Sequence, residues 1–119
     1  MLTKSDLQSL LQCPRKLWLE HNRPDLIDRD SPLLYRRAVD GNVVGERARQ
    51  QLGDGFIWPP GAADKTTAAR NALALLAAAP GRAAAEFPML RDDLYARADA
   101  LVPSNGGYVL RETKSSTFP

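Results

Sequence analysis

Hydrophobic positions recur at helical spacing through the first two thirds of the chain and alternate with polar positions in the last third. In the first stretch, Thr3 followed by Asp6 has the spacing of a capping box, which predicts that a helix starts there. Pro14 suits the first position of a second helix, in which Leu17 and Trp18 are expected to dock. The inner face of the first helix is predicted to consist of Leu7, Leu10 and Leu11.

A long helix is expected from Ser31 and Pro32 to near Gly53, with the serine as its cap. Two glycines lie inside it, and each costs about 1 kcal/mol relative to alanine, which predicts that another backbone passes close by. A further helix is expected between a cap at Asp64 or Thr66 and an end near residues 80–81. The predicted inner face of the long helix comprises Leu34, Gly41, Val44, Gly45, Ala48 and Leu52.

Three segments after Gly81, at 82–90, 94–102 and 107–115, have strand patterns and are separated by turn signals. The expected fold class is therefore α+β, with N-terminal helices followed by a three-stranded antiparallel meander. Asn105-Gly106 is the strongest hairpin signal, and a two-residue turn there places Asp99 opposite Glu112. A turn shifted by one residue would instead place Asp99 opposite Lys114, on the same face of the sheet.

Two opposed carboxylates repel each other, whereas a divalent cation between them would turn this repulsion into attraction. Such an ion can activate water for attack on a phosphate, and Lys114, two residues beyond Glu112, points to the same face. Asp99, Glu112 and Lys114 are therefore the candidate catalytic residues. A pairing of Arg97 with Glu112 on a solvated strand remains the alternative interpretation.

The bulk composition is that of one globular domain: 119 residues, 44% hydrophobic and 25% charged, with a net charge of +2. This charge is too small to indicate a nucleic-acid partner by itself. No apolar run approaches the roughly 18 residues that cross a bilayer, and the polar N-terminus is unlike an export signal. We therefore expect a cytoplasmic protein. Cys13 is the sole cysteine, which excludes an internal disulfide bond.

Several segments, taken in order, resemble RecB-like nucleases of the PD-(D/E)XK superfamily. "LTKSDLQSLLQCPRKLWLEHNRPDL" resembles the N-terminus of the branch in which a "CPR" cysteine and three later cysteines hold an iron–sulfur cluster. "GNVVGERARQQLGDG" is similar to the first-motif helix of that family. "AAEFPML", "LYARADALV" and "GYVLRETKSST" resemble its three core strands.

The resemblance implies that Asp99 and Glu112 bind Mg²⁺ or Mn²⁺, that Lys114 is catalytic, and that Glu46 completes the metal shell. It also implies that Cys13 is the first ligand of an iron–sulfur cluster, which only a longer chain with further cysteines could hold. Glu86, before the apolar part of its strand, is interpreted as structural. The implied activity is hydrolysis of DNA phosphodiester bonds in repair, recombination or defence.

The family core resembles αβββαβ, whereas this chain supplies only αβββ, an incomplete restriction-endonuclease-like core. We therefore expect one truncated nuclease domain over residues 1–119, which lacks the C-terminal part of its own polypeptide and has little or no activity alone. Residues 1–30 would form the cysteine-bearing helical segment and residues 31–119 the nuclease core portion. The alternatives are a non-catalytic remnant that binds nucleic acid or protein, and a small α+β domain whose charges are only solvated.

Overall fold

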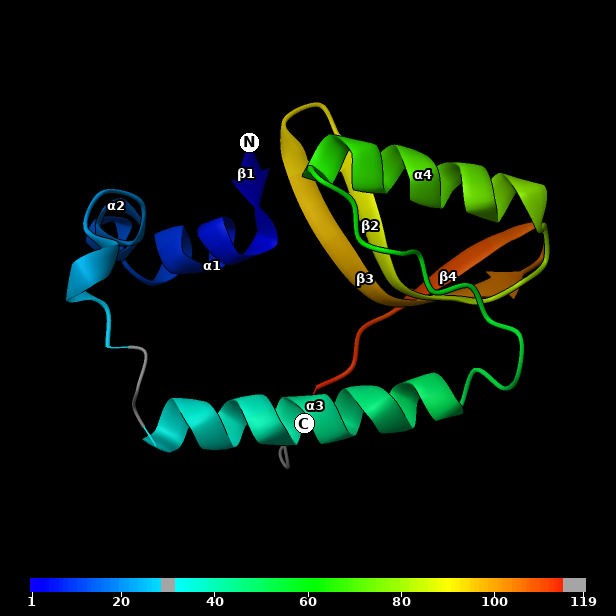
Figure 1. The fold of residues 1–119 in the computed structure, drawn as a ribbon, viewed down its shortest axis with the longest axis horizontal. Coiled ribbons are helices and arrows are strands. Elements are labelled where there is room, and N and C mark those ends of the chain that lie inside the picture. The colour runs from blue at the N-terminus through cyan, green and yellow to red at the C-terminus, as the bar shows by residue number, and fades with distance from the viewer. Residues whose placement is uncertain (29–31, 115–119) are drawn as a thin grey trace.

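The fold combines helices with a four-stranded mixed sheet, which confirms the α+β class (Figure 1). The computed structural model describes residues 1–28 and 32–114. The elements, in chain order, are β1 (Leu2–Thr3), α1 (Lys4–Gln12), α2 (Pro14–Asn22), a 3₁₀ turn (Pro24–Leu26), α3 (Pro32–Gln50), α4 (Lys65–Ala78), β2 (Ala84–Arg91), β3 (Leu94–Ser104) and β4 (Gly107–Arg111).

Strand β3 is the centre of the sheet, with β2 antiparallel along one edge. The other edge is shared by two strands. β1 runs parallel to the start of β3, where Thr3 is opposite Tyr95, and β4 runs antiparallel to its end, where Arg111 is opposite Ala100. The sheet is therefore mixed, not the three-stranded antiparallel one that was expected. Two residues of β1 are too few to produce an alternating pattern, so the sequence carried no signal for this strand.

The β3–β4 hairpin has the predicted turn. Asn105 and Gly106 both adopt positive φ, at 47° and 82°, as a type I′ turn requires. Ser104 is opposite Gly107, which confirms the register counted from the sequence. The ladder ends where Ala100 meets Arg111, so Asp99 and Glu112 are the next residues beyond its last pair.

The core lies between α4 and the sheet, and α4 packs on β2 (Figure 1). Small residues let the helix approach the strands closely, and Phe87 fills the remaining space. The Asp64 carboxylate accepts a hydrogen bond from the Thr67 amide, which confirms the predicted N-terminal cap of α4. The buried core residues are Ala72, Ala84, Phe87, Ala98 and Leu101.

Helices α1 and α2 form a hairpin away from this core (Figure 1). Thr3 and Asp6 make the predicted capping box, and Pro14 starts α2. Leu17 is half-buried, but Trp18 is 58% exposed, so its predicted docking is wrong. In the described part of the chain, the principal contacts of α2 are with α1 and the 3₁₀ turn.

Helix α3 passes below the sheet (Figure 1), and no residue of Pro32–Gln50 is buried. Among the described residues, a Cβ on Gly41 would meet no atom within 4 Å, and one on Gly45 would meet only the side chain of Arg49. The described residues therefore bring no backbone into contact with these two glycines, and the predicted close approach of another backbone stays a prediction. The predicted cap at Ser31 lies outside the described residues. Within the described ranges, no helix is both long and apolar enough to cross a membrane.

Candidate active site

A cleft of about 400 Å³ opens where β1 and β4 part along the edge of β3. β1 leaves the edge after Thr3, and β4 joins it at Arg111. Between these points, the described part of the chain offers no strand partner to residues 96–99 on that edge. The residues that line the cleft include Lys4, Lys65, Tyr95, Arg97, Asp99 and Glu112. The split edge therefore brings two carboxylates and several cations into one opening.

Asp99 is half-buried, and its Oδ2 accepts a hydrogen bond from the backbone N–H of Thr113 at 2.6 Å. This bond holds the chain beside β3 after the regular ladder has ended, so that Glu112 lines the same cleft as Asp99. The side-by-side placement predicted from the turn is therefore present. The second carboxylate oxygen of Asp99, Oδ1, is of the type that binds a metal ion.

Two lysines surround the carboxylate of Glu112. The ammonium of Lys4 contacts Oε1, and Nζ of Lys114 lies 3.5 Å from the same oxygen. The hydrogen bond from Lys4 is the main reason that the pKa of Glu112 is lowered, and the charges of both lysines add to it. The alternative pairing of Glu112 with Arg97 is not observed, because Arg97 Nε lies 3.0 Å from Oε2 of Glu86 instead.

Asp99 also lines a second, smaller cleft of about 200 Å³ between the sheet and α3. Its walls are the glycine-containing face of α3 on one side, and Glu86, Asp99 and Lys114 on the other. Four residues of the predicted inner face of α3 thus line a cleft together with Asp99 and Lys114. Lys114 reaches this second cleft, whereas Glu112 lines the first.

The alignment of Glu86 with the candidate acids was not predicted from the sequence. The pairs Ala85–Ala100 and Phe87–Ala98 bracket it, so Glu86 stands in line with Asp99 and Glu112 across three strands. Counting back from the turn at residues 92–93 would have found this alignment. Glu86 has a φ of 50°, which is unfavourable for a non-glycine residue, and Arg49 and Arg97 both bind its carboxylate.

The other predicted ligands lie elsewhere. Glu46 is exposed on α3 and does not line either cleft, because it lies one residue beyond the lining residue Gly45. Cys13 is exposed at the junction of α1 and α2. In the described ranges, no three His, Cys, Asp or Glu side chains come together as a metal site. The roles of Glu46 and Cys13 therefore stay predictions.

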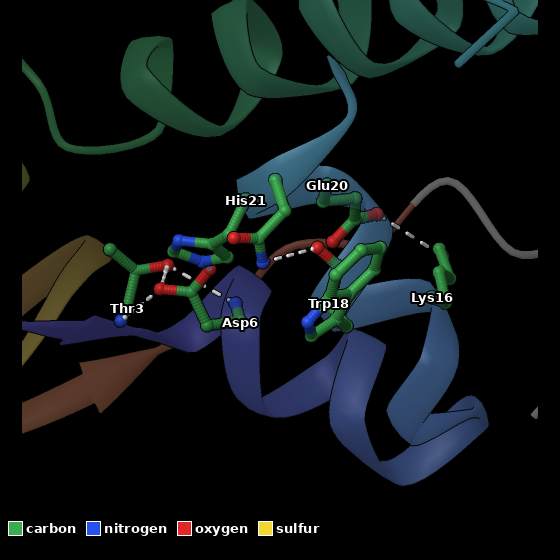
Figure 2. A network of polar contacts seen from close by, with 7 residues as sticks. Thr3, Asp6, Lys16, Trp18, Glu20 and His21 are labelled. Atoms are coloured by element: carbon green, nitrogen blue, oxygen red, sulfur yellow. Dashed lines mark hydrogen bonds and ion pairs between the residues drawn. The ribbon is translucent and has the colours of Figure 1, made fainter. Parts of the chain in front are cut away.

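A polar network fixes the start of α1 (Figure 2), the helix whose first residue is Lys4. Asp6 Oδ2 accepts hydrogen bonds from the backbone N–H and the hydroxyl of Thr3, each at 2.8 Å. Asp6 Oδ1 lies 2.9 Å from Nε2 of His21 on α2. These contacts, the Thr3 backbone N–H first, lower the pKa of Asp6 to about 2. The network therefore ties α2, α1 and β1 together beside the cleft.

Comparison with protein-family models, curated proteins and solved structures finds no match to this chain. Function is therefore inferred from the cleft and from the residues that line it.

Proposed function

We propose that this chain is the metal-binding part of a nuclease of RecB-like PD-(D/E)XK type, which hydrolyses DNA phosphodiester bonds in repair, recombination or defence. In this proposal, a further C-terminal part of the same polypeptide completes the enzyme. The observation that carries the proposal is that Asp99 and Glu112 line one cleft. In addition, Nζ of Lys114 lies 3.5 Å from Oε1 of Glu112. The cationic side chains around the acids are the second support.

The donor set suits a hard divalent cation. Asp99 and Glu112 offer carboxylate oxygens, which Mg²⁺ and Mn²⁺ prefer, in a cleft of about 400 Å³. The ion would lower the pKa of a bound water and neutralise charge on the phosphate. Cys13 alone does not suit an iron–sulfur cluster, which takes four ligands, and no step is derived through one.

Individual residues of the chain would then have separate roles in the reaction. Asp99 holds the Glu112 segment in place through the Thr113 amide, and its other oxygen would be the one to bind the ion. Lys114 donates a hydrogen bond to the attacking water and stabilises negative charge that develops on the phosphate. Its ammonium is close enough to Glu112 to be held there until substrate arrives.

Lys65 is suited to hold a substrate phosphate. It lines the cleft at the start of α4, and its Nζ lies 5.5 Å from the ring centroid of Tyr95. A cation over an aromatic ring is restrained but keeps its charge, because the ring does not neutralise it. Lys65 can therefore contact a phosphate oxygen, and such contacts make binding sensitive to salt.

The test compares cleavage of DNA by the longest natural polypeptide that contains this chain, with Mg²⁺ present. We expect Asp99→Asn, Glu112→Gln and Lys114→Ala each to lower the rate by at least about 100-fold, as loss of an essential group does. Lys16→Ala is the matched control, since Lys16 pairs with Glu20 on α2, away from the cleft. Equal cleavage by the wild type and Lys114→Ala would exclude the proposal.

A second candidate is a nucleic-acid-binding remnant without catalysis. It is favoured by one observation, that Lys4 already neutralises Glu112 without a metal. This candidate predicts DNA binding that weakens with salt but is unchanged by a chelator. The nuclease predicts metal-dependent binding that Glu112→Gln abolishes, so one titration with and without Mg²⁺ separates the two.

A further inference from the structure

We propose that Lys4 acts as a tethered cation at the metal site, which must leave Glu112 before a divalent ion binds. The strand β1 and helix α1 would thereby control metal loading. This inference rests on the proposed function for the metal itself. It adds a regulatory residue, contributed by a segment 108 residues away from Glu112 along the chain.

The contact itself places a positive charge on a proposed metal ligand. The Lys4 ammonium touches Glu112 Oε1, and both side chains line the cleft that Asp99 lines. A lysine ammonium is a compact cation with three donor hydrogens, and carboxylate oxygens are its natural acceptors. Lys4 and a divalent ion would therefore compete for the same oxygen.

The backbone of Lys4 is held firmly by the fold. Thr3 pairs with Tyr95 in the sheet and caps α1, so the residue that follows it has a fixed position. The hydrogen bonds of Asp6 to Thr3 and His21 brace the same turn (Figure 2). Lys4 is thus delivered to the cleft by a structured element, and its side chain alone remains free to move.

The ion pair of Lys4 and Glu112 is exposed enough for a divalent ion to displace Lys4. The side chains of Lys4 and Glu112 are 39% and 37% exposed, and ion pairs of this kind are weak because water screens them. Lys114 approaches the same oxygen, so two ammonium groups serve one carboxylate. Once a divalent ion binds, the repulsion between it and Lys4 favours release of Lys4. Lys114 reaches the second cleft beside Asp99 and can stay near the site.

The test measures Mn²⁺ affinity of the 119-residue chain by calorimetry at low salt. Removing the competing pair in Lys4→Gln should tighten binding by about 3- to 5-fold, the upper part of the range that an exposed ion pair supplies. Lys16→Gln is the matched control because it removes the same charge from a lysine that pairs with Glu20. We expect its affinity to stay within about 1.5-fold of the wild type, because screening weakens distant charges.

A second measurement follows the wild-type chain and does not depend on a variant. The rate at which a succinimidyl ester acylates Lys4, read by peptide mass spectrometry, should rise when Mg²⁺ is added, while the rate at Lys16 stays constant. An unchanged rate at Lys4, or equal or weaker Mn²⁺ binding by Lys4→Gln, overturns the inference and leaves the metal site standing. Absence of Mn²⁺ binding in every variant overturns both the inference and the proposed function.

Discussion

The carboxylate of Asp99 binds the backbone N–H of Thr113, with 2.6 Å between Oδ2 and the amide nitrogen. A side chain thereby replaces the ladder bond that β4 no longer makes after Arg111. Glu112 lies within the segment that this bond holds, so one proposed metal ligand positions the other. The site and the end of the hairpin are consequently a single structural unit.

The Asp99–Thr113 bond can be tested by comparing Asp99→Ala with Asp99→Asn. Alanine leaves the Thr113 amide without its acceptor, and we expect a loss of about 1 kcal/mol in unfolding free energy. Asparagine keeps an acceptor oxygen and should retain most of that free energy. Amide hydrogen exchange at Thr113 should accelerate in the alanine variant alone. Equal exchange in all three proteins would contradict the role given to this bond.

The two glycines Gly106 and Gly41 should respond to alanine in opposite directions. Gly106 has a φ of 82°, where a side chain is strained, so Gly106→Ala should destabilise the chain by about 1 kcal/mol. Gly41 is helical with open space around it, so Gly41→Ala should stabilise by up to about 1 kcal/mol. Urea unfolding measures both. Destabilisation by Gly41→Ala would show that another segment packs closely on α3.

Acid should weaken the α1–α2 hairpin through Asp6. Its pKa is about 2 in the folded chain and 3.8 without these contacts, so its stabilisation is complete above about pH 4. It is then lost as the pH falls from about 4 to about 2, and we expect a change of about 1 to 2 kcal/mol. The measurement is urea unfolding across this range.

Other carboxylates with lowered pKa, Asp64 and Glu112 among them, also contribute to acid unfolding. The informative quantity is therefore the difference between the wild type and Asp6→Asn, since asparagine accepts hydrogen bonds but does not titrate. That difference should change between pH 4 and 2 and stay constant above it. A difference that is independent of pH would exclude the carboxylate as the cause.

Metal affinity should distinguish Glu46 from Glu112. Glu112 lines the cleft, so Glu112→Gln should weaken Mn²⁺ binding by more than about 10-fold, as loss of a direct ligand does. Glu46 is exposed and lines neither cleft, so Glu46→Gln should change the affinity by less than about 2-fold. A comparable loss in both variants would mean that α3 moves onto the site when metal binds.

Local features were predictable from the sequence because short-range geometry decides them. The capping box of Thr3 and Asp6 and the cap of α4 each depend on residues three positions apart, and the start of α2 depends on the fixed φ of Pro14. The Asn105-Gly106 turn works in the same way, since its two positive φ angles set the register. That register alone was enough to bring Asp99 and Glu112 together.

Tertiary structure decided what depends on segments that are distant in sequence. β1 is two residues long and gains its place only by pairing with β3, and through it Lys4 reaches Glu112. Trp18 is exposed because α2 packs mainly against α1 and the 3₁₀ turn. The lack of described atoms within 4 Å of a Cβ on Gly41 likewise depends on where distant segments pack. The sequence by itself therefore determined the helices, the turn and the acid pair. The split sheet edge, and the cation that it delivers to the acids, arise from long-range pairing that no local pattern encodes.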